Sequence, residues 1–245
     1  MRPLKVKTKS SVYQLVSLLA ALFLLPSKTP ILIGTLSASS AAIVLSASKS
    51  EAKDISEIAR IAKAITVRIE GATQGSGVII NKDGNTYTVL SSWHVLQDNT
   101  DGEEIGIITS DGEEHTLKAK SLKRVGEVDL GLITFKSTKS YQLAEIGNTK
   151  DVSMGNQIFV SGFPLPTAAI PMSFLRFLDG RVIANATIRI PDGYQLLYSN
   201  PTLKGMSGGS VLNNQGKLIG IHGRAERDDQ ISSGMGKSIA TRTNM

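Results

Sequence analysis

The sequence predicts an all-β protein built from antiparallel strands. From residue 66 onwards, short runs rich in β-branched residues follow one another, and turn-forming pairs such as Asp101-Gly102 and Asp192-Gly193 separate them. No long helical period of apolar residues appears in the same part of the chain. Ten candidate strands within residues 54–245 favour an antiparallel barrel or a sandwich, and the pattern alone leaves both open.

The individual elements follow from local patterns. Apolar residues recur with helical spacing between residues 54 and 64, and Asp54 is a suitable N-cap, so one short amphipathic helix is expected before the strands. His115 follows an acidic turn, which predicts a surface position. The candidate strands cover residues 66–70, 77–81, 86–91, 104–108, 130–135, 157–161, 182–190, 195–199, 210–212 and 217–222.

The first 53 residues differ from the rest in charge and hydropathy. The first ten carry four basic residues and no acidic one, and the apolar run that follows, residues 12–25, ends at Pro26. This order is typical of a signal peptide, so residues 1–53 are interpreted as a leader that is either removed or retained as a membrane anchor. The run is shorter than the ~20 residues of a comfortable membrane span, which favours removal. Either way, residues 54–245 are expected outside the cytoplasm, secreted or periplasmic.

Composition excludes several classes of protein. The 245 residues are enough to bury a core without a metal or disulfide staple. The absence of cysteine excludes disulfides, cysteine-ligated zinc and thiol catalysis. The formal charge is +6, but residues 1–53 hold seven of the 27 basic residues and one of the 21 acidic ones, which leaves 20 of each in the remainder. Because the charges of that remainder are balanced, no nucleic-acid partner is expected. Contact with a membrane is expected only through an uncleaved leader.

Three residues point to acyl-transfer chemistry. Ser207 has glycines at −2, +1 and +2, so the backbone can fold tightly and direct the amide N–H groups of Gly205 and Ser207 at one oxyanion. His94 ends a β run, and Asp129 opens an apolar strand, where a buried carboxylate needs a donor such as a histidine N–H. Taken singly, each has a simpler interpretation: a glycine-rich turn, a core histidine or a turn-capping aspartate. Together, in the order His, Asp, Ser, the three residues are a strong signal of acyl-transfer chemistry.

This order and its surroundings resemble the trypsin-like (chymotrypsin-clan) serine proteases, in particular bacterial members such as the HtrA proteases and the glutamyl endopeptidases. The resemblance spans residues 60 to 223 and rests on the motifs Gly75-Ser76-Gly77, Ser92-Trp93-His94-Val95, Val128-Asp129-Leu130, Gly162-Phe163-Pro164 and Gly205-Met206-Ser207-Gly208-Gly209. It implies two antiparallel six-stranded β-barrels, at about 60–140 and 150–245, with the active site in the cleft between them.

The resemblance also implies roles. Ser207 would be the nucleophile, His94 the general base and Asp129 the residue that orients His94, with no cofactor or metal required. The substrates would be proteins or peptides. The alternative is a catalytically inactive, protease-like module that binds a partner in the same cleft. An esterase of the α/β-hydrolase type is disfavoured, because its residues follow the order Ser, Asp, His.

A substrate pocket is suggested by the same family. In glutamyl endopeptidases a histidine in a Gly-Ile-His segment lines the primary specificity pocket, here His222, assisted by a Thr or Ser five residues before the nucleophile, here Thr202. Both side chains can donate hydrogen bonds to a carboxylate, so cleavage after Glu or Asp is expected. Alternatively, His222 only satisfies backbone groups of a core strand. The edge expected to pair with the substrate backbone comprises Gly223, Arg224 and Ala225.

The segment after His222 offers little material for the second barrel. Either a short strand within residues 237–241 closes it, or the barrel is truncated. The oligomeric state is not indicated by any of these patterns.

Overall fold

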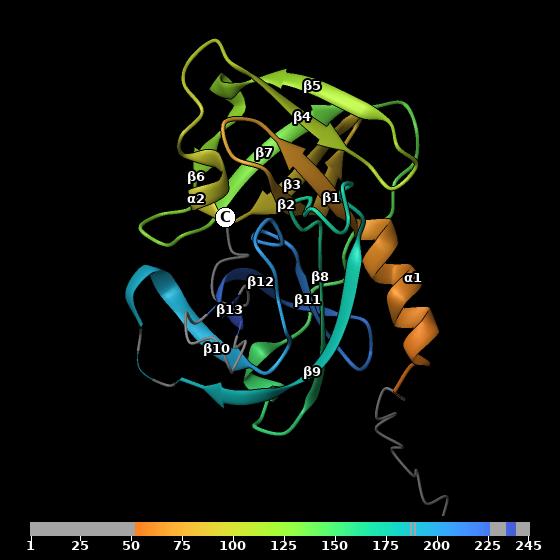
Figure 1. Cartoon of the computed structure of the whole chain (residues 1–245), viewed down its shortest axis with the longest axis vertical. Coiled ribbons are helices and arrows are strands. Elements are labelled where there is room, and N and C mark those ends of the chain that lie inside the picture. Colours follow the sequence, from red (N-terminus) through yellow and green to blue (C-terminus); the bar gives the residue numbers. More distant parts are fainter. Residues whose placement is uncertain (1–51, 187, 189, 226–233, 239–245) are drawn as a thin grey trace, which may run out of the picture. The chain divides into compact units, whose positions relative to one another are not determined.

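The fold is set by short antiparallel strands whose apolar faces pack into buried cores, as the sequence predicts. The computed structural model describes residues 52–186, 188, 190–225 and 234–238, all within the unit Ser48–Met245. Residues 1–51 of the expected leader and residues 239–241 of the expected closing strand lie outside these described residues. The strands form two sheets, and helix α1 (Ile55–Ile65) lies beside both (Figure 1). This arrangement confirms the all-β, two-barrel class.

The first sheet has seven antiparallel strands in the order β5-β4-β1-β2-β3-β7-β6. It is one strand larger than the expected six, because Lys123 and Arg124 pair with Leu132 and Gly131 on the outer side of β7. The sheet carries the short helix α2 (Trp93–Leu96) directly after β3 and the 3-10 turn η1 (Ala119–Ser121) after β5. Its strands are β1 (Thr66–Glu70), β2 (Gly75–Asp83), β3 (Thr86–Ser91), β4 (Glu104–Ile108), β5 (Glu114–Lys118), β6 (Lys123–Arg124) and β7 (Gly131–Lys136).

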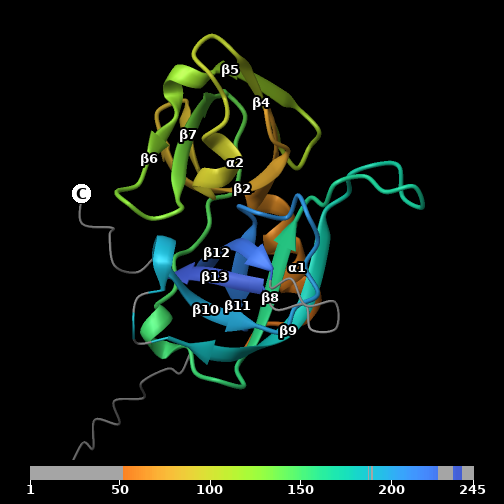
Figure 2. The ribbon, with the colours of Figure 1, turned by 60° about the vertical axis from the view of Figure 1, so that its left-hand side comes forward.

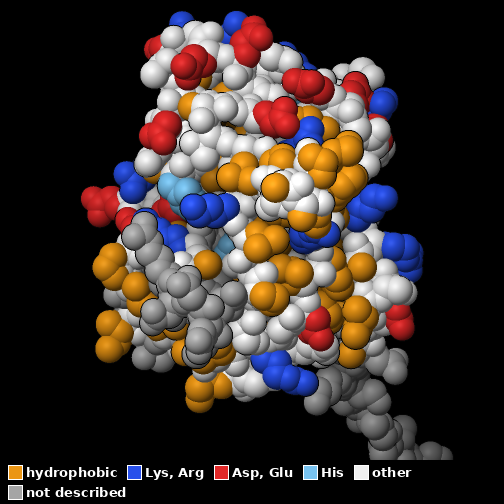
Figure 3. Space-filling view, in the orientation of Figure 1, with side chains coloured by type: hydrophobic (Ala, Val, Ile, Leu, Met, Phe, Trp, Pro, Cys, Tyr) orange, Lys and Arg blue, Asp and Glu red, His pale blue; other side chains and the backbone are white. Residues whose placement is uncertain are grey.

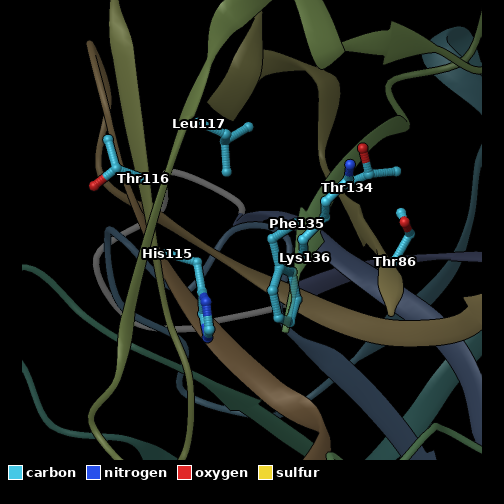
Figure 4. A pocket seen from close by; sticks show the side chains of 7 residues that line it. All are labelled: Thr86, His115, Thr116, Leu117, Thr134, Phe135 and Lys136. Carbon is cyan, nitrogen blue, oxygen red and sulfur yellow. The ribbon is translucent and has the colours of Figure 1, made fainter. Parts of the chain in front are cut away.

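Strong curling brings strand β5 of the first sheet to the face of β7. The ring centroids of His115 on β5 and Phe135 on β7 are 4.5 Å apart, and His115 Nε2 lies 3.2 Å from the Tyr141 hydroxyl. These two strands line a pocket of about 420 Å³ with Thr86 of β3 (Figure 4). His115 is therefore half-buried among aromatic rings rather than fully exposed. The acidic turn before it gave no sign of this packing.

The second sheet is a closed barrel in the order β10-β13-β12-β11-β8-β9, with β9 pairing β10 (Figure 2). Strand β13 inserts between β10 and β12, so a short C-terminal strand does close the barrel and the truncated alternative is wrong. The 3-10 turns η2 (Thr149–Asp151) and η3 (Pro191–Gly193) flank the barrel strands. The strands are β8 (Gln157–Gly162), β9 (Arg176–Asn185), β10 (Tyr194–Tyr198), β11 (Ser210–Asn213), β12 (Leu218–Ala225) and β13 (Gly234–Ser238).

Helix α1 joins the two sheets. Asp54 caps it, since its side chain accepts the N–H of Ser56, and its inner face buries Ile58, Ala62 and Ile65. These residues share one apolar cluster with Val78 and Leu90 of the first sheet, with Ala144 of the segment between the sheets, and with four barrel residues, Phe159, Leu212, Leu218 and Ile221. The predicted amphipathic helix is thus confirmed, and it covers the junction between the sheets. In the described residues no helix is long and apolar enough to cross a membrane.

The surface separates charged from apolar side chains. Acidic residues gather over the first sheet, and apolar side chains lie across the middle of the face shown in Figure 3. Several of the exposed apolar residues belong to the β8–β9 loop, residues 163–175. This loop contacts the Ser207 turn, because Leu165 N–H donates to the Lys204 carbonyl at 2.8 Å. The exposed apolar residues of the loop are Leu165, Ile170, Met172 and Phe174.

Candidate active site

His94 and Asp129 are joined by two hydrogen bonds at the edge of the first sheet. Helix α2 begins just after Ser92, so the backbone N–H of His94 is free to donate to Asp129 Oδ1, at 2.7 Å. The imidazole Nδ1 lies 2.8 Å from Asp129 Oδ2. Asp129 is 4% exposed, whereas the His94 side chain is 30% exposed. When Nδ1–H donates to the carboxylate, the neutral imidazole presents its other nitrogen, Nε2, as a proton acceptor.

Asp129 also makes two hydrogen bonds across the junction between the sheets, one as acceptor and one as donor. The Tyr194 hydroxyl donates to Asp129 Oδ2 at 2.6 Å, and the Asp129 N–H donates to the Asp192 carbonyl at 2.9 Å. Burial, and then the hydrogen bond to Asp129, raise the pKa of Tyr194 well above its usual range, so the hydroxyl remains protonated. Sequence reasoning missed Tyr194, because no spacing pattern links it to a residue 65 positions earlier.

The glycines around Ser207 are required by close backbone packing. Gly205 and Gly208 have φ of +91° and +88°, a region that residues with a side chain rarely adopt. A Cβ on Gly205 would lie 2.6 Å from Leu165 N. A Cβ on Gly208 would overlap the Ser76 carbonyl, and one on Gly209 would overlap the Ser161 carbonyl. The predicted tight turn around Ser207 is therefore formed by packing against both sheets.

Ser207 lies next to the His94 segment. Its carbonyl accepts the N–H of Ser76 at 2.8 Å, and Gly75 separates that carbonyl from Val95, the residue after His94. The Ser207 hydroxyl donates to the Gly223 carbonyl at 3.0 Å. No hydrogen bond joins Ser207 to His94 in the described part of the chain. The structure thus brings His94 and Asp129 together directly and directs Ser207 at β12.

Two backbone donors remain at the Ser207 turn. Among the described residues, the N–H groups of Gly205 and Ser207 have no hydrogen-bond acceptor. Their neighbours do, since Met206 N–H donates to Leu203, Gly208 N–H to His222 and Gly209 N–H to Met206. Two unpaired amides on one glycine-rich turn can bind an anionic oxygen.

His222 and Thr202 are both buried close to this turn. The His222 carbonyl accepts from Gly208 N–H at 2.7 Å and from Ser92 Oγ at 3.0 Å, which ties β12 to the Ser207 turn and to the segment before His94. His222 Nδ1 lies 2.7 Å from the Tyr198 hydroxyl, and complete burial raises the pKa of Tyr198. The Thr202 hydroxyl is buried without a hydrogen-bond partner in the described residues. Tyr198 was not among the predicted site residues.

The expected substrate edge lies at the end of β12. Arg224 and Ala225 pair with Met235 and Gly234 of β13, while the last β12 residue paired with β11 is Ile221. On the β11 side, residues 223–225 therefore have no strand partner within the described chain. The Arg224 guanidinium binds Asp192 at 2.9 Å and lies 5.1 Å from the Tyr194 ring centroid.

Comparisons with known proteins identify the family of the chain. The profile of the family described as trypsin-like peptidase domain matches residues 75–221, more than half of the chain. The chain belongs to this family. Among the described residues of this peptidase domain, no group of three or more His, Asp or Glu side chains is placed to hold a metal ion.

Curated relatives of this trypsin-like domain are bacterial serine proteases. Serine protease Do-like HtrA of Bacillus subtilis is 24% identical over 67% of the chain and 36% of its own length. The probable periplasmic serine endoprotease DegP-like of Pseudomonas putida is 28% identical over 62% of the chain and 29% of its own length. Serine protease HtrA-like of Staphylococcus aureus is 28% identical over 60% of the chain and 19% of its own length. The chain spans about a third or less of each of these relatives.

Proposed function

We propose that the chain is a serine endopeptidase in which His94, Asp129 and Ser207 form the catalytic triad. The observation that carries the proposal is the pair of hydrogen bonds between His94 and the buried Asp129, beside a serine turn with two amides that have no acceptor among the described residues. The proposal includes the domain boundaries expected from the sequence, a leader at residues 1–53 and a peptidase domain at residues 54–245. The mechanism uses only these side chains and backbone donors.

In this mechanism the Ser207 hydroxyl turns from the Gly223 carbonyl to His94 Nε2. Such contacts often tighten only when substrate binds. Ser207 Oγ then attacks the peptide carbonyl as Nε2 takes its proton, and the amides of Gly205 and Ser207 bind the oxyanion. Imidazolium gives the proton to the leaving amine, which leaves an acyl-enzyme. Water, deprotonated by His94, hydrolyses the ester and restores Ser207.

Preference for Glu or Asp before the cut bond is the finer part of the proposal. The buried Thr202 hydroxyl has no hydrogen-bond partner in the part of the chain that the structure describes, and a substrate carboxylate would accept its proton. If Tyr198 donates to His222 Nδ1, the neutral imidazole carries its proton on Nε2, where it can donate to the same carboxylate. Residues 223–225 would pair with the substrate backbone, and the apolar β8–β9 loop would contact neighbouring substrate side chains.

The proposed location is outside the cytoplasm. The Pseudomonas putida relative is described as periplasmic, and residues 1–25 have the charge and hydropathy order of an export signal. The proposed substrates are proteins or peptides in that compartment.

The test of the triad is labelling with a fluorophosphonate probe, which reacts with an activated serine. The full chain is expected to be labelled, and the matched variants Ser207→Ala and His94→Ala are expected to lose labelling. One observation favours the noncatalytic binding module instead: the Ser207 hydroxyl donates to Gly223 and not to His94. Absence of labelling in a folded wild-type protein would support that module.

Specificity is tested with peptides that differ only before the cut bond, carrying Glu, Gln, Ala or Arg. We expect kcat/KM for Glu to exceed that for Gln at least ~10-fold, because the pocket hydrogen bonds distinguish a carboxylate from an amide. Thr202→Val, which removes the hydroxyl at similar volume, should reduce this ratio. Equal hydrolysis of all four peptides would contradict the Glu/Asp preference and leave the triad assignment intact.

A further inference from the structure

We infer that Tyr194 is a positioning residue of this site: its hydroxyl, supplied by the second barrel, holds the Asp129 carboxylate in the orientation that accepts the His94 Nδ1–H. The inference rests on the proposed function, because positioning matters for a reaction only if His94 is the base. It also has a structural content, the Tyr194–Asp129–His94 chain of hydrogen bonds, that can be measured without catalysis.

The contact is short and buried. The Tyr194 hydroxyl lies 2.6 Å from Asp129 Oδ2, within the range of a charge-assisted O–H···O⁻ bond. Tyr194 is 1% exposed and Asp129 4% exposed. The same oxygen accepts His94 Nδ1, while Oδ1 accepts the His94 N–H. Tyr194 therefore acts on the oxygen that faces the imidazole.

The surrounding backbone is shaped to place this hydroxyl. A Cβ on Gly223 would overlap the Tyr194 hydroxyl, so glycine at position 223 leaves the space that the hydroxyl fills. A Cβ on Gly193, where φ is +79°, would lie 2.5 Å from Val128 Cγ1, so the turn before Tyr194 packs directly on the residue before Asp129. Asp192 has a φ of +62°, which is unfavourable for a residue with a side chain.

That strained turn also binds Asp129 through its backbone: the Asp192 carbonyl accepts the N–H of Asp129 at 2.9 Å. Arg224 of β12 fixes the turn from the other side, through Asp192 Oδ2 at 2.9 Å and over the Tyr194 ring. The charged groups around the contact are thus His94 of α2, Asp192 of η3 and Arg224 of β12. Three elements thus surround the Tyr194–Asp129 pair, which indicates a built contact rather than an incidental one.

The first test compares Tyr194→Phe with Tyr87→Phe in the full chain. Tyr87 is a matched control, because it is also fully buried, and its hydroxyl donates to the Lys139 carbonyl and not to a site residue. Tyr194→Phe is expected to lower kcat roughly ten-fold with KM unchanged, because one charge-assisted hydrogen bond to Asp129 is lost. The acid limb of its pH–rate profile, which follows protonation of His94, should move to higher pH, because an Asp129 carboxylate without this donor keeps more negative charge and favours the imidazolium.

Tyr87→Phe should leave kcat, KM and the pH profile at wild-type values. Equal kinetics in Tyr194→Phe and wild type would overturn the inference, and so would a loss of kcat in Tyr194→Phe without any change of the pH profile.

The second test separates the inference from the proposed function. The low-field proton resonance of the His94 Nδ1–H is recorded in Ser207→Ala, which needs no activity. Adding Tyr194→Phe should shift this resonance and speed its exchange with water, whereas adding Tyr87→Phe should not. If wild type neither hydrolyses peptides nor reacts with the probe, the proposed function fails, and a shifted resonance still supports the positioning contact. An unchanged resonance overturns it.

Discussion

At the residue scale, the glycines around Ser207 are the positions where the chain tolerates least change. Gly208 combines a φ of +88° with direct contact to the Ser76 carbonyl and the Ser91 hydroxyl. A methyl group there must both adopt an unfavourable backbone conformation and displace the backbone of β2. The Ser207 turn is thus specified by space as well as by chemistry.

We expect Gly208→Ala to lower the free energy of unfolding by about 2–4 kcal/mol, measured by urea denaturation. Gly84→Ala is the matched control, because Gly84 also has a positive φ, +55°, but a Cβ there would contact nothing within 4 Å. It should cost only about 1 kcal/mol, the backbone contribution alone. Equal losses in the two variants would show that crowding at Gly208 is unimportant.

The candidate site could be predicted from sequence where its residues sit in short motifs. His94, Asp129 and Ser207 each have neighbours that restrict their conformation, so local patterns identify them. Asp192-Gly193 predicts a turn before Tyr194 but not its partner: Asp129 lies just before β7 of the first sheet, and only the folded turn brings them together. Contacts of this kind depend on how the two sheets pack, which no local pattern encodes.

At the element scale, α1 stabilises the molecule through one face. Ile58 is completely buried in the cluster between the sheets, whereas Ile55, three residues earlier, is 49% exposed. We expect Ile58→Ala to lower the free energy of unfolding by about 2–4 kcal/mol, through lost burial and a remaining cavity. Ile55→Ala in the same helix should change it by less than about 1 kcal/mol. Similar losses measured by urea denaturation would contradict this assignment of faces.

The turn between β4 and β5 is an ion-pair network. Lys139 binds Asp111 at 2.9 Å and Glu113 at 2.6 Å. The Thr109 hydroxyl and then Lys139 lower the pKa of Asp111, and Lys139 followed by Tyr141 lowers the pKa of Glu113. Because both pKa values are depressed in the folded state, the stabilisation is present above the ordinary values of 3.8 and 4.5 and is lost as pH falls below them.

Lys139→Met should therefore lower the urea midpoint of unfolding at pH 7. Between pH 7 and pH 3, the midpoint of this variant should fall by less than that of the wild type. The effect should be small, because the side chains are partly exposed to solvent. Lys136→Met is the control: Lys136 is also exposed and has no ion pair in the described part of the chain. It should retain the wild-type pH dependence, and an identical change in both variants would exclude the network as its cause.

Strands were predicted well where turns bound them on both sides. The expected strand at residues 86–91 coincides with β3, because Gly84-Asn85 begins it and the Ser92 cap ends it. Strand β5 was missed, since Leu117 is the single apolar residue of Glu114–Lys118 and one residue shows no alternating pattern. The strand expected at 182–190 is displaced, because β9 begins at Arg176, where it pairs with Gly162 of β8. Pairing between strands, rather than composition, sets these limits.

At the scale of the whole molecule, the two sheets share one core. Leu130 and Val78 of the first-sheet side, Phe159 and Leu212 of the barrel and Ile58 of α1 belong to a single buried cluster. Ser76 and Asp129 add hydrogen bonds across the same junction, to Gly205 and to Tyr194. Neither sheet buries these apolar faces alone, so the junction that carries the candidate site also links the stability of the two sheets.

Unfolding is therefore expected to be a single transition. Trp93, the one tryptophan, reports on the first sheet by fluorescence, and far-UV circular dichroism reports on strands of both sheets. Phe159→Leu, which alters the barrel side of the shared cluster, should cost about 1–2 kcal/mol and shift both urea curves equally. Phe135→Leu in the first sheet serves as the matched variant and should also shift both. If Phe159→Leu left the Trp93 transition unchanged, the sheets would unfold independently, and the hydrogen bond from Tyr194 to Asp129 would contribute little to coupling them.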